Sequence, residues 1–207
     1  MIANVHSQHL DKNSHIFDSM FRDRKRVFVD ILRWDIPTSG PYEKDQFDDD
    51  EAEYFIICDH ASGQHFGSMR ILRTDRPHIL GSIFPQLCET DPPAGPQYRE
   101  LTRLCLSPSL RARDRLHVRN RLFTSLVEYA LLNGIEGYTG VAEMGWYSQL
   151  LALGWKCTPL GLPQDINGEM LAAVLAHISP DTINLFRAAG TYESGDFILT
   201  DQVRKAA

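Results

Sequence analysis

Apolar side chains recur at spacings of three and four in two long stretches of the chain, which is the pattern of amphipathic helices. The first stretch covers residues 14–33 and the second covers residues 113–133, where Gly134 supplies a stop signal. Shorter helices are expected over residues 144–153 and over the segment MLAAVLAHI, residues 170–178. Each pattern leaves one polar face, so these helices are expected to cover another layer of structure.

Short apolar runs bounded by turn residues predict strands at residues 54–58, 66–72, 98–106, 138–142 and 155–158. A turn around Ser62 and Gly63 joins the first two, and the Pro-rich segment 91–96 precedes the third. A loop runs from Pro37 through the acidic stretch 45–53. Mixed strands, a long helix and a closing β-α-β unit predict an α/β fold, a single-domain three-layer α/β/α sandwich with a mixed central sheet over residues 1–207.

Composition narrows the class of protein further. The 207 residues are 43% hydrophobic and 23% charged, which suits one globular domain, and a net charge of −6 argues against a general nucleic-acid binder. The four cysteines are far apart and no Cys/His motif suggests a metal site, so reduced core thiols and no bound metal are expected. No segment has the length of a signal peptide or membrane span, so we expect a cytoplasmic protein without membrane insertion.

Arg24 is the first residue that breaks the local pattern. It lies three residues after Phe21 and four before Phe28, inside the apolar stripe of the first predicted helix. A buried arginine is costly unless a carboxylate or phosphate pairs with it. Asp45 and Asp48 are possible partners in the acidic loop; alternatively the Arg24 stem extends to the surface and the loop is simply solvated.

Three further charged residues, Arg70, Glu100 and Arg103, fall on predicted strands. Glu100 and Arg103 are separated by an odd number of residues, so a regular strand would direct them to opposite faces, and a β-bulge would bring them closer. Surface ion pairs are the simpler interpretation of each.

Five arginines surround the start of the helix at 113–133, and Arg111, Arg115 and Arg119 share one face if this helix begins early. Cations at a helix N-terminus oppose the helix dipole, so an anionic partner is expected to offset them. An acidic carrier protein or the phosphates of coenzyme A would serve. The alternative is a solvated face partly balanced by Asp114.

Five short motifs between residues 20 and 106 together resemble the acyl-homoserine-lactone synthase (autoinducer synthase) family. In order, they comprise Arg24, Phe28 and Trp34; Asp45, Phe47 and Asp48; Gly67 to Arg70; Phe84; and Glu100, Thr102 and Arg103. A looser match continues through YTGVAEMGWYSQLLALGW. Two departures are Arg33, where the family commonly has glycine, and the segment LSPSLRARDR, which lacks the pyrophosphate loop of acetyltransferases.

The resemblance implies a GNAT-like acyltransferase fold, with an S-adenosylmethionine half over residues 14–106 and an acyl-donor half over residues 107–207. It implies a cytoplasmic enzyme that transfers an acyl group to S-adenosylmethionine and then forms a lactone, releasing methylthioadenosine. The product would be a quorum-sensing signal. S-adenosylmethionine would be a co-substrate, an acyl-carrier protein or coenzyme A thioester the acyl donor, and no cofactor would be permanently bound.

The chemistry of this reaction and the resemblance together suggest roles for individual residues. Glu100 is the expected base, tuned by Arg103. Thr139 occupies a position that in this family bears on acceptance of a 3-oxo group, and the basic face (Arg111, Arg115, Arg119) is expected to dock the donor. The S-adenosylmethionine site would comprise Arg24, Phe28, Trp34, Asp45, Asp48, Arg70, Phe84 and Thr102.

Two other functions fit part of the sequence. A GNAT-fold N-acyltransferase with a different amine acceptor would share the fold, and a non-catalytic regulatory module could bind an acyl carrier through the arginines. Neither would use Arg24, Trp34 and the acidic loop. Formation of methylthioadenosine separates the synthase from both.

Overall fold

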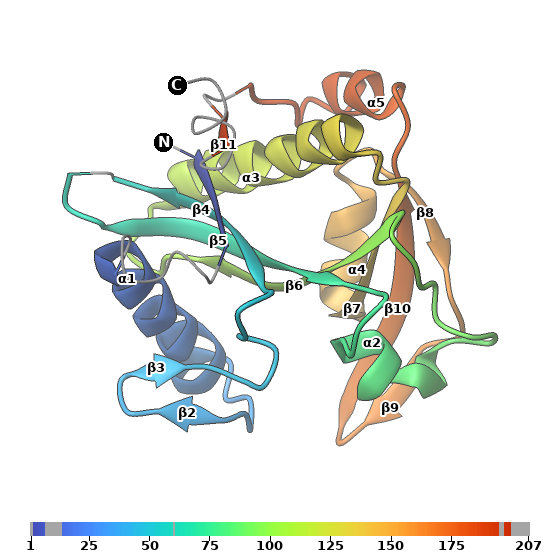
Figure 1. Ribbon diagram of the computed structural model, residues 1–207, viewed down its shortest axis with the longest axis horizontal. Coiled ribbons are helices and arrows are strands. Elements are labelled where there is room, and N and C mark those ends of the chain that lie inside the picture. Colours follow the sequence, from blue (N-terminus) through green and yellow to red (C-terminus); the bar gives the residue numbers. More distant parts are fainter. Residues whose placement is uncertain (1, 7–13, 60, 195–196, 200–207) are drawn as a thin grey trace. The chain divides into compact units, whose positions relative to one another are not determined.

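The computed structural model describes residues 2–6, 14–59, 61–194 and 197–199, which fall into two compact units (Figure 1). Unit 1 comprises Met1–Ile71, Arg103–Ser125 and Glu193–Ala207, and unit 2 comprises Leu72–Thr102 and Leu126–Tyr192. Strand β6 (Tyr98–Leu106) and helix α3 (Ala112–Asn133) contribute residues to both. The single-domain organisation and its division at residue 106 stay predictions.

Unit 1 is built on a mixed sheet with the strand order β11-β1-β4-β5-β6. Its strands are β1 (Ile2–His6), β4 (Glu53–Cys58), β5 (His65–Arg73) and β11 (Phe197–Leu199), besides the end of β6. Strand β1 is parallel to β11 and antiparallel to β4, which is antiparallel to β5. The strands predicted at 54–58 and 66–72 are confirmed, and the turn between them contains Gly63 at a φ of 71°, a conformation that favours glycine.

The first predicted helix is in fact two helices in succession. It begins as α1 (Ser14–Arg24) and continues as a π-helix, η2 (Lys25–Ile31). Single π turns inside helices are frequent at functional sites because they redirect the following side chains. Here the change of helix type begins directly after Arg24.

Helices α1 and α3 cover the two faces of strands β4 and β5 (Figure 1). On one face, Phe17 of α1 contacts Tyr54 edge-on, with ring centroids 5.4 Å apart. On the other, a Cβ added to Gly67 would lie 2.5 Å from Cγ1 of Val118, so α3 approaches β5 closely because residue 67 is glycine. The two covered faces explain why every residue of β4 is buried.

A small hairpin lies within the region expected to be a loop between residues 37 and 53. It pairs β2 (Thr38–Ser39) with β3 (Tyr42–Glu43), and Gly40 in the turn has a φ of 58°. The apolar and polar pattern of the sequence did not predict this hairpin.

Unit 2 is built on a second set of paired strands, in the order β6-β7-β10-β8, with β9 paired to β10. Besides the start of β6, these are β7 (Gly137–Glu143), β8 (Lys156–Pro159), β9 (Gln164–Ile166) and β10 (Glu169–His177). The β6–β7 pair is parallel and the other pairs are antiparallel. The helices of this unit are α2 (Ile79–Ser82), η3 (Pro85–Leu87), α4 (Met144–Leu151), α5 (Thr182–Ala188) and the second part of α3.

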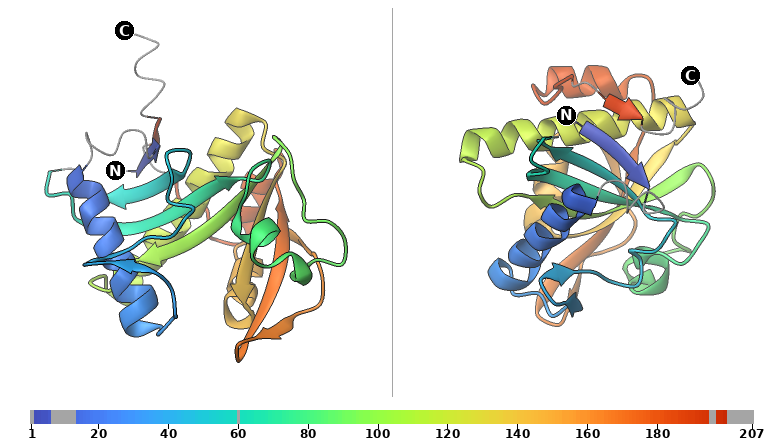
Figure 2. Two further views of the ribbon diagram at one scale, coloured as in Figure 1. Left: turned by 60° about the horizontal axis from the view of Figure 1, so that its bottom comes forward. Right: turned by 60° about the vertical axis from the view of Figure 1, so that its left-hand side comes forward.

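The helix predicted over residues 170–178 is wrong, because this segment forms strand β10. Its alanines and leucines have a high helix propensity, but the strand pairs with β7 on one side and with β8 and β9 on the other. Hydrogen bonding to strands on both sides overrides the local preference. Asn167 and Gly168, at φ values of 56° and 90°, form the two-residue turn of the β9–β10 hairpin (Figure 2).

The predicted α/β fold class is confirmed, because a mixed sheet and flanking helices are both present. The helices expected at 113–133 and 144–153 and the strands at 98–106, 138–142 and 155–158 are confirmed within a few residues. Among the described residues, no helix combines the length and the apolar character needed to cross a membrane.

Candidate active site

Arg24, the last residue of α1, is fully buried and bound by two carboxylates. Its Nη1 and Nη2 donate to the two oxygens of Asp48 at 2.8 and 2.9 Å, and its Nε donates to Oε2 of Glu43 at 2.6 Å. Its Cζ also lies 5.0 Å from the centroid of the Phe21 ring. The side chain therefore does not extend to the surface, and carboxylates compensate its burial.

Two further arginines complete a closed arrangement with these carboxylates. Arg70 donates to both oxygens of Asp45, at 2.6 and 3.0 Å, and its Nη1 lies 2.9 Å from Oδ1 of Asp48. Arg103 donates through Nε to Glu43 at 3.0 Å and through Nη2 to Asp45 at 2.7 Å. Surface ion pairs are the wrong interpretation of Arg70 and Arg103, whose side chains are 0% and 12% exposed.

Each carboxylate thus bridges two arginines, and the six side chains form a ring of alternating charge within unit 1. We refer to them as the ion ring, which consists of Arg24, Glu43, Arg103, Asp45, Arg70 and Asp48 in that order. Three guanidinium groups balance three carboxylates, so the ring carries no formal net charge. A buried ionic network is stable only when its members are paired in this way.

The acidic loop supplies two members of the ring because its backbone is fixed locally. Phe47 is buried, as expected for an aromatic anchor, and its N–H donates to Oδ1 of Asp45 at 2.9 Å. The N–H of Asp45 donates to Oδ2 of Asp48 at 2.9 Å. The loop is therefore ordered around these carboxylates and is not merely a solvated acidic stretch.

Two residues of the site, Glu43 and Tyr54, are absent from the set that the sequence predicted. Glu43 is completely buried, and Tyr54 donates its hydroxyl hydrogen to Oδ1 of Asp48 at 2.6 Å. The spacing of two between Glu43 and Asp45 was a usable signal, because alternate residues of an extended segment point the same way. Tyr54 gave no signal, since an aromatic residue is ordinary in a buried strand.

The arginines of the ring keep the carboxyl groups of Asp45 and Asp48 ionised. Burial opposes ionisation of Asp48, but the charges of Arg24 and Arg70 outweigh it and keep the pKa of this carboxyl well below its ordinary value. Burial likewise disfavours the charged form of Asp45, whose pKa is nevertheless lowered by Arg70 and Arg103. Burial and the neighbouring charge of Asp48 raise the pKa of Tyr54, which keeps that hydroxyl a hydrogen-bond donor.

Two aromatic side chains lie beside the ion ring. Phe28 and Trp34 are stacked, with ring centroids 4.9 Å apart and an interplanar angle of 15°. The Cζ atom of Arg103 lies 5.8 Å from the Phe28 centroid and 6.0 Å from the Trp34 centroid. Arg33, between them in sequence, has a φ of 62°, so the conformation expected of glycine is kept although the residue is arginine.

Arg103 is the least enclosed arginine of the ion ring. It has a φ of 56°, which interrupts the regular geometry of β6. Among the described residues, hydrogen bonds from its side chain use Nε and Nη2, and none uses Nη1. The ring thus leaves the Nη1 nitrogen of Arg103 to donate to another partner.

Glu100 lies on the part of β6 that belongs to unit 2, and it is completely buried. Its Oε2 and Oε1 accept the backbone N–H groups of Ile79 and Leu80, each at 2.8 Å. The carboxylate therefore caps the first turn of α2, where negative charge is favourable.

Three other predicted residues also lie in unit 2. Thr102 is buried, and Phe84 packs against the apolar cluster of Leu80, Leu87 and Ala173. Thr139, on β7, is buried, and its hydroxyl has no hydrogen-bond partner among the described residues. A buried hydroxyl without a partner is costly, so a ligand atom that accepts its hydrogen would be favoured there.

The basic residues at the start of α3 share a face, as expected. The N–H of Arg115 donates to the carbonyl of Arg111 at 2.9 Å, so helical hydrogen bonding begins at Arg111. Arg111 is exposed, whereas Arg115 donates to the carbonyl of Ser107 at 3.1 Å and Arg119 to Oδ1 of Asn120 at 2.9 Å.

Proteins that are similar to this chain give independent information about its family. Residues 7–202 match the family model described as autoinducer synthase. An acyl-homoserine-lactone synthase from Rhizobium etli is 30% identical over 184 residues, which cover 86% of this chain and 85% of that protein.

Solved structures agree with the sequence comparison. The CoA-dependent acyl-homoserine lactone synthase MesI has a TM-score of 0.82 at 26% identity, covering 95% of this chain and 98% of that one. BjaI, solved with SAM and isopentyl-CoA, has a TM-score of 0.83 at 22% identity, with coverage of 96% and 92%. A Lactobacillus plantarum protein described as an N-acetyltransferase shares the fold, with a TM-score of 0.54 at 15% identity over 86% of this chain and 99% of that one.

Proposed function

The chain belongs to the autoinducer synthase family, and we propose that its ion ring and the Phe28–Trp34 pair form the S-adenosylmethionine site. The observation that carries this proposal is the closed alternation of three arginines and three carboxylates, which presents Arg103 beside two stacked aromatic rings. Burying this many charged groups is costly for folding, and such arrangements are frequent at functional sites. A ligand that carries charges and an aromatic ring would match the groups present.

The enzyme is an acyltransferase that makes an acyl-homoserine lactone, a quorum-sensing signal, from S-adenosylmethionine and an acyl thioester. The α-amine, after losing a proton, attacks the thioester carbonyl and expels the thiol. The methionyl carboxylate then attacks its own γ-carbon and expels methylthioadenosine. The second step is intramolecular, so accurate positioning of the carboxylate supplies much of its acceleration.

The carboxylate, the adenine and the sulfonium of S-adenosylmethionine have complementary groups in unit 1. The unused Nη1 of Arg103 suits the methionyl carboxylate, which it holds as a charge-assisted hydrogen-bond donor. The Phe28–Trp34 stack suits the adenine and the sulfonium, through stacking and cation–π attraction. Arg24 and Arg70 bind no substrate atom in this scheme; they position the carboxylates of Asp45 and Asp48.

Glu100 is proposed as the base that removes a proton from the α-ammonium group, directly or through a water molecule. Its two oxygens accept the backbone N–H groups of Ile79 and Leu80, each at 2.8 Å. The α2 backbone thereby fixes the orientation of the carboxylate. Arg103 remains the expected partner that tunes it.

Thr139 is proposed to contact the acyl chain. Its unpartnered hydroxyl is a donor for a 3-oxo group, while a plain acyl chain would leave it unsatisfied. Phe84 and Thr102 are retained as proposed S-adenosylmethionine residues on the strength of the family motif.

Arg111, Arg115 and Arg119 are proposed to dock the acyl donor, either coenzyme A or an acyl-carrier protein. Because Arg115 and Arg119 already bind protein acceptors, we expect Arg111 to give the strongest effect. Replacing all three with Glu should raise KM for the acyl donor with little change in KM for S-adenosylmethionine. Lys156→Glu, a charge reversal at an exposed residue of β8, is the control, and an unchanged donor KM in the triple variant would remove the docking role.

The function is tested by incubating the purified enzyme with S-adenosylmethionine and a mixture of acyl-coenzyme A and acyl-carrier substrates. Mass spectrometry should detect methylthioadenosine and an acyl-homoserine lactone in equal amounts. Acyl transfer without methylthioadenosine would instead indicate a different amine acceptor. Loss of S-adenosylmethionine binding in Trp34→Ala, measured by calorimetry, tests the site itself.

A further inference from the structure

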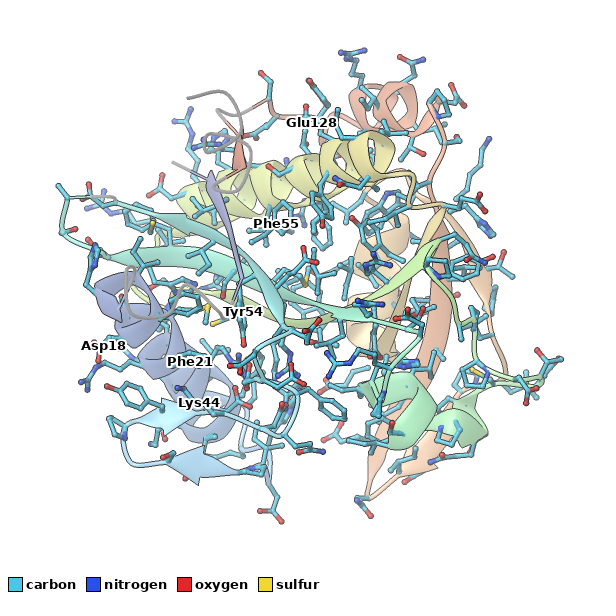
Figure 3. All side chains as sticks on the ribbon, in the orientation of Figure 1. Asp18, Phe21, Lys44, Tyr54, Phe55 and Glu128 are labelled. Atoms are coloured by element: carbon cyan, nitrogen blue, oxygen red, sulfur yellow. The ribbon has the colours of Figure 1, made fainter. Side chains whose placement is uncertain are left out.

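Four side chains on the outside of unit 1 connect α1 to strand β3 and the residue after it. The hydroxyl of Tyr42 donates to Oδ1 of Asp18 at 2.6 Å, and Nε of Arg22 donates to Oδ2 of the same residue at 2.9 Å. Lys44 Nζ lies 4.3 Å from the Phe21 ring centroid and 5.8 Å from that of Tyr42. We call Asp18, Arg22, Tyr42 and Lys44 the outer clasp; Figure 3 shows Asp18, Phe21 and Lys44 close together on the α1 side.

The clasp and the ion ring use alternate residues of one extended segment. Residues 42 and 44 make the clasp, whereas Glu43 and Asp45 make the ring. Side chains alternate between two sides of an extended chain, so contacts on one side fix the position of groups on the other. Because Arg103 is held in the ring by Glu43 and Asp45, its position depends on this same segment.

We propose that the outer clasp positions Glu43 and Asp45, and through them Arg103, for binding S-adenosylmethionine. Tyr42 and Lys44 are thus positioning residues that touch no substrate. The proposal rests on the assignment of the ion ring to the S-adenosylmethionine site.

The chemistry of the clasp supports a positioning role. Both oxygens of Asp18 are used, one by each partner, which restricts its side chain to a single orientation. Hydrogen bonds from Arg22 and Tyr42 lower the pKa of Asp18, so the carboxylate remains an acceptor throughout the neutral range. A lysine above two aromatic rings adds attraction without a directional hydrogen bond.

The test compares Tyr42→Phe and Asp18→Asn with wild type, measuring KM for S-adenosylmethionine, KM for the acyl donor, kcat and the thermal midpoint. Each variant should raise KM for S-adenosylmethionine about 3- to 10-fold and leave the donor KM unchanged. The double variant should show less than the sum of the two single effects, because Tyr42 and Asp18 are partners in one hydrogen bond. Lys44→Met should also raise KM for S-adenosylmethionine, whereas Lys44→Arg should retain the wild-type KM.

Asp75→Asn is the matched control, because Asp75 is a carboxylate near the surface bound by Nε of Arg73 at 2.9 Å, as Asp18 is by Arg22. It should leave both KM values unchanged. Unchanged KM for S-adenosylmethionine in Tyr42→Phe and Asp18→Asn would overturn the proposal, as would an equal rise in both KM values. If the wild-type enzyme did not bind S-adenosylmethionine, the assignment of the ion ring to the S-adenosylmethionine site would be wrong. This outcome is seen with the wild-type enzyme alone, so it is distinct from failure of the clasp proposal.

Discussion

Replacing Arg24 with Met is expected to destabilise the folded protein strongly. The substitution keeps an unbranched apolar stem but removes the guanidinium group, which binds Asp48 through two nitrogens and Glu43 through a third. Three carboxylates would then face two arginines, leaving one uncompensated negative charge in a buried site.

Breaking a buried ion pair from one side costs ~3–5 kcal/mol. In a chain of 207 residues, each kcal/mol changes the thermal midpoint by ~2–4 °C, so a decrease of ~6–20 °C is expected. Urea titration measures the loss of unfolding free energy, and calorimetry measures the decrease of the thermal midpoint independently. A loss below ~1 kcal/mol, the range of surface pairs, would refute the burial argument.

The pH dependence gives a second check on the cause. The folded-state pKa of Asp48 is lowered, so its stabilisation is present above its ordinary value of 3.8 and is lost as the pH falls through the folded value. Without Arg24 this carboxyl binds a proton more readily, and acidification costs the variant less. The stability difference between wild type and Arg24→Met should therefore shrink as the pH falls below 3.8, and a constant difference over that range would contradict this explanation.

A charge-balanced double variant separates lost pairing from lost packing. In Arg24→Met/Asp48→Asn, Arg70 and Arg103 still face Asp45 and Glu43, two charges of each sign. Removing both partners of a buried pair is far less costly than removing one. The double variant should thus recover at least half of the stability lost; no recovery would mean that packing of the Arg24 stem dominates.

Three further changes test individual roles. Glu100→Gln should lower turnover at least ~10²-fold if Glu100 is the base. Wild-type turnover of the variant at every pH would remove Glu100 from that role. Thermal melts of the variant control for the loss of the hydrogen bonds between Glu100 and α2. Trp34→Ala should weaken S-adenosylmethionine binding ~10-fold or more without changing donor KM, and equal affinity would exclude the stack. Thr139→Val should reduce the preference for 3-oxo over plain acyl donors ~5-fold or more, and an unchanged ratio would exclude its hydroxyl.

Local sequence patterns were sufficient for most of the regular structure. Long amphipathic helices and buried strands follow from side-chain periodicity, so α1, α3, β4 and β5 lie where the pattern indicated. The exception, β10, has a helical composition, and only its neighbours on both sides make it a strand. Short elements such as the β2–β3 hairpin were missed because two-residue strands carry no periodic signal.

The chemistry of the site was decided partly by sequence and partly by tertiary contacts. An arginine inside an apolar stripe is costly unless an acidic group pairs with it, so the sequence marked Arg24 as a candidate site residue, and the structure decided against extension of its stem to the surface. Asp48 was among the partners expected for Arg24, but Glu43 was not, and Asp45 instead binds Arg70 and Arg103. Closing a ring of alternating charges depends on where four separate segments meet, and sequence spacing does not encode that meeting point.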